Sequence, residues 1–434
     1  MGTNTKIMTN YYQYKRLLKK QTTCKASGAT RAQSLGVLYS FFMHISLKYS
    51  CIIALMAVFT TPVLSKNIVV KNADELRVAA AKALPGDELV IANGNYKEWA
   101  CELVGHGTAN APIIIRPETP GRVVFTGTVL KTMFLLSGSY LQLQGLVFEE
   151  CVLHKAEGST PLIIELRADH SRITACSFKR NEVKSQFMPI VAVTGIGEQN
   201  RIDHCQFIGN VNNMDIQVRV APSTVPLNTL IDHNEFVDKP RVTWPVFNGG
   251  ECVQIGQDPV LLGTKSAFAT VRDNRFIRCK AEPEVISNKS SGNQYIHNYL
   301  EDCEGELVMR GGHDCLVDSN TFKGGICGIR VNGSHHVITH NIISHTQTAI
   351  RLMYGMSKGK DEVGFYVAAT NCLITGNQIS NVNTGILLGD SKDMDWTGKF
   401  DTKRYPSRTL QDIPPADNTI KDNVILSAGV AIKK

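Results

Sequence analysis

The feature that most constrains this chain is a loose internal repeat through its central and C-terminal parts. In each copy an apolar residue is followed three positions later by Asn or Cys, and two positions after that by a second apolar residue. The central residues lie 29, 29, 40, 24, 22, 21, 36 and 46 positions apart, so the unit has roughly 21–24 residues and longer gaps hold insertions. The nine copies are Ile173/Cys176/Phe178, Ile202/Cys205/Phe207, Ile231/Asn234/Phe236, Val271/Asn274/Phe276, Tyr295/Asn298/Leu300, Val317/Asn320/Phe322, Ile338/Asn341/Ile343, Ile374/Asn377/Ile379 and Ile420/Asn423/Ile425.

Units of this length cannot bury their apolar faces alone, but stacked units share a continuous core. Asn suits a corner because it tolerates the left-handed backbone conformation, and stacked Asn side chains can hydrogen-bond along the pile. No long amphipathic helices separate the copies. The sequence therefore predicts an all-β fold, a right-handed parallel β-helix.

One helix is predicted at residues 72–84, where Asn72 is a capping residue, acids follow it, and Pro85-Gly86 is a stop signal. We expect this helix to cover the open N-terminal end of the stack, whose strand edges would otherwise be exposed. No matching cap is evident at the C-terminus. Insertions at about 240–270, 351–372 and 382–419 are expected to loop over one face, where sites tend to lie.

The net charge of +7 comes from the first 65 residues, which hold eight Lys and Arg and no acid. Removing those eight from the 46 basic residues leaves 38, against 39 Asp and Glu. The remainder is nearly neutral, so overall charge gives no case for a nucleic-acid partner. Attraction to an acidic ligand would have to be local.

Residues 43–65 resemble a signal peptide. A short basic start precedes the apolar stretch from Cys51 to Phe59, which is too short for a membrane span, and Val63-Leu64-Ser65 fits a cleavage site before Lys66. Residues 1–42 form an extension of uncertain meaning, with Met43 as an alternative start. We therefore expect a secreted or periplasmic domain at 66–434, without stable membrane insertion after cleavage; a membrane anchor is the alternative.

Ten of the twelve Cys follow Ser65, and none forms a CxxC pair. Most stand beside apolar strand residues, as Cys176 and Cys205 do. We interpret them as free thiols packed in the core, the alternative being disulfides that export would permit.

The densest group of polar residues runs from Asn248 to Arg330. Asn248-Gly249-Gly250-Glu251 precedes a predicted strand at 253–256. Glu282 and Glu284 are two apart, so on a strand both carboxylates would face one side and repel unless a cation lay between them. Oxygen ligands of this kind suit Ca²⁺.

Lys289 precedes Arg310 by 21 residues, about one coil of the predicted stack. Neighbouring coils would therefore bring these two cations side by side on one face. A His recurs before the corner residue of several copies (His204, His233, His297 and His340), and this recurrence with the repeat indicates a structural role.

These residues resemble polysaccharide lyase family six, the alginate lyases and chondroitinase B, over about residues 66–430. The matching segments are Leu84-Pro85-Gly86-Asp87, Gly94-Asn95-Tyr96, Asn248-Gly249-Gly250-Glu251, Glu282-Pro283-Glu284-Val285-Ile286-Ser287-Asn288-Lys289-Ser290, Gly305-Glu306-Leu307-Val308-Met309-Arg310 and Gly328-Ile329-Arg330-Val331.

The resemblance implies a Ca²⁺ site formed by Asn248, Glu282 and Glu284, together with Glu251. It implies Lys289 as catalytic base and Arg310 as catalytic acid. It also implies substrate binding by a further set of residues, which are Arg330, His313, Arg351 and Tyr354. One departure is clear: the family usually has His directly after the Arg, whereas Gly311-Gly312 stand here before His313.

The chemistry fits an acidic polysaccharide substrate. Elimination removes the proton on C5 of a uronic acid, which puts a second negative charge on the acid group unless a cation neutralises the carboxylate. Bound Ca²⁺ does this as a Lewis acid, and Lys289 must be neutral to accept the proton. Arg310 could protonate the leaving O4 or only stabilise its charge.

We expect alginate rather than chondroitin or dermatan sulfate as the substrate, because Gly328–Val331 followed by His335-His336-Val337 resembles the alginate members more. The sequence does not decide between mannuronate and guluronate, or between endo and exo cutting. A non-catalytic carbohydrate-binding β-helix remains an alternative, which the displaced His313 favours. A β-helix hydrolase would need clustered acids, and the spacing of Asp273, Asp302, Asp314 and Asp318 does not cluster them.

Overall fold

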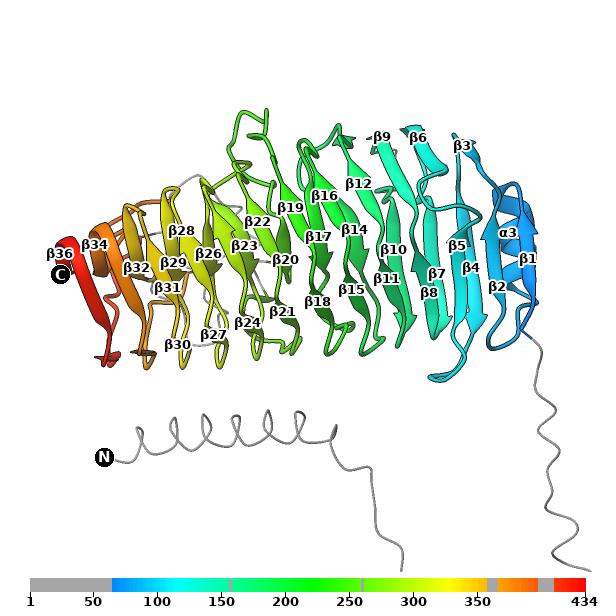
Figure 1. Ribbon diagram of the computed structural model, residues 1–434. Coiled ribbons are helices and arrows are strands. Elements are labelled where there is room, and N and C mark those ends of the chain that lie inside the picture. The colour runs from blue at the N-terminus through cyan, green and yellow to red at the C-terminus, as the bar shows by residue number, and fades with distance from the viewer. Residues whose placement is uncertain (1–64, 156–157, 259–260, 357–365, 397–409) are drawn as a thin grey trace, which may run out of the picture. The chain divides into compact units, whose positions relative to one another are not determined.

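Each copy of the repeat forms one coil, and successive coils stack in parallel register into an elongated right-handed β-helix (Figure 1). The computed structural model describes residues 65–155, 158–258, 261–356, 366–396 and 410–434. The predictions for residues 1–42 and for the signal peptide up to residue 64 lie outside them. The predicted fold class is confirmed.

Every coil places one short strand in the first stack, which forms a continuous sheet. Its strands are β1 (Asn67–Val70), β2 (Glu88–Ile91), β5 (Ile113–Pro117), β8 (Leu141–Gln144), β11 (Arg172–Thr174), β15 (Arg201–Asp203), β18 (Leu230–Asp232), β21 (Thr270–Arg272), β24 (Gln294–Ile296), β27 (Leu316–Asp318), β30 (Val337–Thr339), β33 (Leu373–Thr375) and β35 (Thr419–Lys421).

The second and third stacks follow along each coil and join where strands run through both. The second contains β3 (Gly94–Tyr96), β6 (Val123–Val129), β9 (Val147–Leu153), β12 (Ser177–Lys179), β13 (Glu182–Val183), β16 (Gln206–Ile208), β19 (Glu235–Val237), β22 (Arg275–Ile277), β25 (Tyr299–Glu301), β28 (Thr321–Lys323) and β31 (Ile342–Ser344). The third contains β4 (Cys101–His106), β7 (Phe134–Ser139), β10 (Ile164–Asp169), β14 (Pro189–Val193), β17 (Met214–Val218), β20 (Val253–Ile255), β23 (Glu284–Asn288), β26 (Glu306–Met309), β29 (Cys327–Val331) and β32 (Thr348–Met353). The long strand β34 (Gln378–Asp390) runs through both stacks, because it pairs with β31 of the second and with β32 of the third. The long strand β36 (Val424–Lys433) pairs in turn with β34.

The apolar residue after each corner packs into the core, and on four successive coils it is a Phe whose ring stacks on the next. Phe178 and Phe207 have ring centroids 4.7 Å apart, and the next two steps of the column, to Phe236 and Phe276, are 4.9 and 4.7 Å. All four side chains are buried. Identical residues in register on neighbouring coils thus give the stack its packing.

The corner Asn residues form the hydrogen-bonded column that the repeat predicts. Asn274 Nδ2 donates to Asn298 Oδ1 at 3.0 Å, and Asn298 Nδ2 donates to Asn320 Oδ1 at 3.0 Å. The expected left-handed backbone at the Asn itself is wrong, because positive φ falls on the preceding residue, as at His233 and Asp273. That residue makes the turn, which directs the Asn amide inward.

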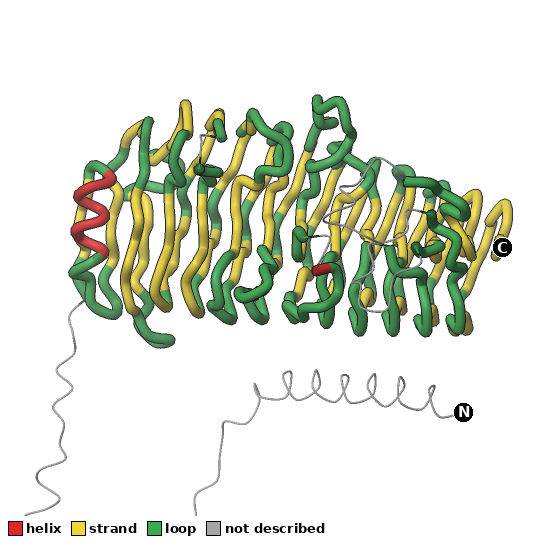
Figure 2. The backbone as a smooth tube through the Cα atoms, turned by 180° about the vertical axis from the view of Figure 1, so that it is seen from behind, coloured by secondary structure: helices red, strands yellow, loops and turns green. Residues whose placement is uncertain are grey.

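The helix predicted at 72–84 begins as expected and ends early, as α3 (Ala73–Ala80) at the N-terminal end of the stack (Figure 2). Asn72 Oδ1 accepts the Glu75 N–H at 2.8 Å. The helix ends because Lys82 and Ala83 donate to carbonyls only three residues earlier as the chain tightens toward Pro85.

The three predicted insertions are shorter than expected, because strands of the stack run into them. β20 lies inside 240–270, β32 continues to Met353, and β34 continues to Asp390. The actual loops are 238–252, 256–269, 354–372 and 391–418, the last three including segments outside the described residues.

The nine cysteines whose side chains are described are buried and free, as predicted. Burial raises the pKa of Cys101, Cys151, Cys315 and Cys372 to about 12, so these thiols stay protonated and pack as apolar groups. Among the helices that the structure describes, none is long and apolar enough to cross a membrane.

Candidate active site

One residue from each coil of the third stack forms a row along the outer face of the sheet. The members of the row are paired with one another in the register of the parallel sheet. Most of them have core residues on both sides along their own strand, and successive side chains of a strand point to opposite faces of the sheet. The side chains of the row therefore point outward. The row runs through Gln217, Gln254, Ser287, Val308, Arg330 and Arg351. Most of the candidate residues lie on or beside this row.

Glu282 and Glu284 reach the site by different routes. Only Glu284 belongs to β23, so the expectation that both stand on one strand is wrong; Pro283 separates Glu282 from the ladder. The Glu282 carboxylate accepts the backbone N–H groups of Gly249 (3.1 Å) and Gly250 (3.2 Å). These contacts bring the Asn248–Glu251 turn against the two acids.

Glu284 is held by Ser287 of its own strand and by two arginines of the following coils. Its Oε2 accepts Ser287 Oγ–H at 2.5 Å, while Oε1 pairs with the Arg330 guanidinium and lies 3.9 Å from Arg310 Nη1. Although burial opposes ionisation, Arg330, Arg310 and Lys289 hold the pKa of Glu284 at about 2. Glu284 is therefore a permanent anion at neutral pH.

Lys289 and Arg310 lie on adjacent coils, as their spacing predicts. The pairing of Asn288 with Met309 places the two residues that follow side by side. Lys289 is 6 % exposed, and its Nζ donates to Glu251 Oε1 at 3.1 Å. The Arg310 guanidinium lies 5.2 Å from the centre of the Tyr366 ring.

The Arg310 guanidinium stays charged in this setting. Burial lowers its pKa, but the electrostatic influence of Tyr366, Glu284, Glu251 and Glu282 outweighs burial and raises the pKa above the ordinary Arg value. Arg310 is therefore better suited to stabilise negative charge than to release a proton.

The carboxyl groups of Glu251 and Glu282 influence each other's pKa. Burial, followed by the charges of Glu251 and Glu284, raises the pKa of Glu282 well above its usual range. Glu251 is also buried, but Lys289 keeps its pKa below the ordinary value. Glu251 Oε2 is buried without a hydrogen-bond donor among the described residues.

These properties test whether the residues fit Ca²⁺. The donors are oxygens, as calcium prefers, and the unpaired Glu251 oxygen together with the raised pKa of Glu282 shows negative charge that the protein does not fully compensate. In the described ranges, however, no three His, Cys, Asp or Glu side chains already converge as a metal site. The oxygen ligands therefore suit a cation, although carboxylate oxygens of Glu282 and Glu284 accept hydrogen bonds from the protein in this structure.

The residues expected to bind substrate differ in placement. Arg351 is engaged by protein acids, since its Nε donates to Glu306 Oε1 at 2.8 Å and its Nη1 donates to Asp390 Oδ2 at 2.6 Å. Tyr354 follows β32, and its ring packs over Gly389. His313 is half exposed with Nδ1 2.6 Å from Asp314 Oδ2, and no contact between it and the carboxylates is seen in the part of the chain described.

Packing explains the glycine at position 312 of the Gly311-Gly312 departure. A Cβ at Gly312 would lie 2.4 Å from the Ser290 carbonyl oxygen, and φ there is +91°, whereas a Cβ at Gly311 would make an ordinary van der Waals contact with Leu262 at 3.4 Å. The turn that carries Leu262 thus fills the space beside Arg310. Spacing did not identify this contact or Tyr366, because both come from loops rather than from the repeat.

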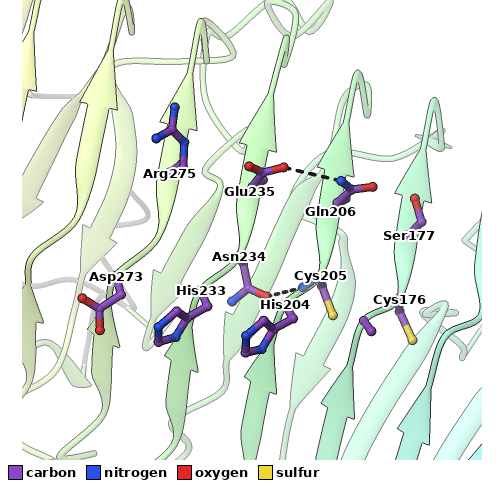
Figure 3. Close-up of a pocket in the computed structure, with 11 residues that line it drawn as sticks. Cys176, Ser177, His204, Cys205, Gln206, His233, Asn234, Glu235, Asp273 and Arg275 are labelled. Atoms are coloured by element: carbon purple, nitrogen blue, oxygen red, sulfur yellow. Dashed lines mark hydrogen bonds between the residues drawn. The ribbon is translucent and has the colours of Figure 1, made fainter.

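A pocket of about 400 Å³ lies at a corner of the stack and shares no lining residue with the carboxylate site (Figure 3). His204 and His233 lie parallel there, with ring centroids 5.1 Å apart. Their Nδ1 atoms lie 2.6 Å and 2.9 Å from the buried carboxylates of Asp203 and Asp232. This arrangement supports the predicted structural role of the recurring His.

The fold and the site define a class of protein: a parallel β-helix with cationic side chains and buried carboxylates on one outer face. The family model for chondroitinase B matches residues 70–433. The chain therefore belongs to this family, polysaccharide lyase family 6, and is a polysaccharide lyase.

Three solved structures illustrate the similarity. A mannuronic acid specific family 6 lyase from human gut microbiota is 24% identical, with TM-score 0.70 over 85% of this chain and 82% of its own. The family 6 alginate lyase AlyGC is 27% identical, with TM-score 0.69 over 84% of this chain; the match spans 53% of AlyGC. The family 6 lyase Pedsa3628 from Pseudopedobacter saltans is 21% identical, with TM-score 0.66 over 85% and 92%. No curated protein sequence matches.

Proposed function

We propose that this protein is an exported alginate lyase that cleaves the polymer by calcium-assisted β-elimination and leaves 4,5-unsaturated uronate ends. The observation that carries the proposal is the contact of Lys289 Nζ with Glu251 Oε1, one coil from Arg310 and beside two further buried carboxyl groups. Export rests on the predicted signal peptide. The alginate lyase AlyGC, 27% identical, supports the choice of polymer.

Lys289 is the proposed base that removes the C5 proton. Its Nζ is tethered by one hydrogen bond to Glu251, so it can turn toward a sugar while the carboxylate stays fixed. Loss of the proton needs a neutral amine, and the product ammonium would be stabilised by the same carboxylate.

Arg310 is proposed to act at the leaving O4 oxygen. Its raised pKa favours stabilisation of the developing negative charge, with proton delivery to O4 as the alternative role. Arg330, paired with Glu284, would share its remaining N–H groups with a substrate carboxylate.

Asn248, Glu251, Glu282 and Glu284 would hold the calcium ion. When bound there, it would neutralise the substrate carboxylate and so make the C5 proton more acidic.

Dermatan or chondroitin sulfate is the second candidate substrate, because the matching family model is that of chondroitinase B. The test is a panel of alginate, polymannuronate, polyguluronate, dermatan sulfate and chondroitin sulfate, followed by ultraviolet absorbance of the unsaturated uronate. Unsaturated ends from alginate alone support the proposal. Cleavage of only the sulfated polymers moves the assignment to them, and binding without new absorbance supports a non-catalytic protein.

A further inference from the structure

A chain of side-chain hydrogen bonds leads along the outer face to the proposed base. Arg219 Nε donates to Gln217 Oε1 at 2.8 Å, Gln217 Nε2 to Gln254 Oε1 at 2.6 Å, and Gln254 Nε2 to Glu251 Oε1 at 2.5 Å. Lys289 Nζ donates to the same Glu251 oxygen. Five residues from three neighbouring coils are thus connected end to end.

The polarity of this chain is fixed by its ends. Arg can only donate, and an ionised carboxylate can only accept. Two amides between them satisfy every contact in one orientation only, with each oxygen toward Arg219 and each NH₂ toward Glu251. Reversing either amide would place two acceptors or two donors against each other, which is costly at buried positions.

Burial makes the orientation consequential. Gln217 is 3 % exposed, Gln254 4 % and Glu251 1 %, so water cannot readily replace a lost partner. Gln217 Nε2 also approaches Met214 Sδ at 3.5 Å, which is a weak acceptor. Neither glutamine is among the acids or cations that the elimination uses directly.

We propose that Arg219, Gln217 and Gln254 are positioning residues that fix the Glu251 carboxylate and, through it, Lys289 Nζ. This inference rests on the proposed function for its catalytic meaning. The Gln254 N–H holds Oε1 of Glu251 where Lys289 reaches it, and Oε2 is then left without a protein donor. Arg219 does not contact Lys289 in this chain of bonds, but through the two amides it sets the orientation of the Glu251 carboxylate to which Lys289 Nζ donates.

The fixed polarity gives a sharp test. In Gln217→Glu the new carboxylate still accepts from Arg219 but cannot donate to Gln254, so the Gln254 amide must reverse and turn its oxygen toward Glu251. Gln217→Met removes both bonds and keeps the volume. A positioning role predicts that Gln217→Glu is at least as damaging as Gln217→Met, whereas a space-filling role predicts the opposite, because Gln217→Glu retains size and gains an ion pair with Arg219.

On a cleaved polymer, both Gln217 variants should lose at least tenfold in kcat with KM within about twofold, since a small misplacement of a reacting group costs this much or more. Arg219→Lys, which still donates, should retain more kcat than Arg219→Met. A change confined to KM, unchanged kcat, or a Gln217→Glu variant more active than Gln217→Met would overturn the proposal. Thermal unfolding identifies a variant that has lost its fold. In that case the kcat of the other, folded Gln217 variant relative to wild type decides whether the proposal stands.

Crystal structures separate this inference from the proposed function. Wild type should show all four hydrogen bonds, and Gln217→Glu should show a reversed Gln254 amide with Lys289 Nζ displaced from Glu251 Oε1. If Glu251 and Lys289 do not move, the chain does not position them, whatever the activity. If they move while wild type cleaves no polymer of the panel, the proposed function fails and the positioning chain stands.

Discussion

His336 should make the stability of this stack depend on pH. Its imidazole is fully buried one coil beyond Arg310, with Nδ1 3.2 Å from the Cys315 backbone N and Nε2 3.1 Å from the Asn332 carbonyl oxygen. The Cys315 N–H requires an unprotonated Nδ1, so the neutral ring with its proton on Nε2 satisfies both contacts. Burial lowers the pKa of His336 from 6.5 to about 4.

The sign of the effect follows from proton linkage. Between pH 6.5 and about 4 the unfolded chain binds a proton that the folded chain refuses, so stability falls as the pH falls. The pKa difference corresponds to about 3 kcal/mol once both states are protonated. Most of that loss, roughly 2 kcal/mol, should appear between pH 7 and pH 5.

Urea unfolding of wild type and His336→Gln at pH 7 and pH 5 measures this term. Gln retains one donor and one acceptor but does not titrate, so the variant should lose about 2 kcal/mol less than wild type over this pH step. His345→Gln, at an exposed position, is the matched control and should follow wild type. Equal pH dependence in wild type and His336→Gln would refute the assignment.

Three further predictions concern the site and the stack. Arg310→Lys keeps the charge but loses the planar fork, so kcat on the cleaved polymer should fall by about 10²–10³ with the fold intact by circular dichroism. Glu282→Gln should weaken calcium binding at least tenfold by calorimetry, while Glu102→Gln, at an exposed position of β4, should not; unchanged affinity in Glu282→Gln would exclude that ligand. Asn298→Ala removes side-chain bonds to two neighbouring coils and should cost about 3 kcal/mol in urea unfolding, against less than about 0.5 for the exposed Asn383→Ala.

The repeat predicted the fold because its signal is local and recurs in every coil. Each corner Asn has the same role, so its 21–24 residue spacing was enough to indicate stacked coils and to place Lys289 beside Arg310. The error about left-handed backbone shows the limit of this reasoning. Both the Asn and the residue before it recur with the same period, and spacing does not tell which of them makes the turn.

The site was predicted less completely because much of it comes from outside the repeat. Glu282 reaches the cluster from a bend rather than from the strand, and Tyr366 and Leu262 come from loops whose paths the sequence pattern does not determine. Gln217 and Gln254 were missed for another reason. A buried Gln carries no charge to mark it, and its importance appears only when the direction of its hydrogen bonds is known.

The most direct test of the central claim compares wild type with Lys289→Ala on alginate, following the absorbance of unsaturated uronate at equal protein concentration. Lys289 is the proposed base, so the variant should lose at least the roughly 10²–10⁴-fold that removal of a general base costs, while its binding of the polymer stays close to that of wild type. Unsaturated ends formed by Lys289→Ala at a rate near that of wild type would contradict the account.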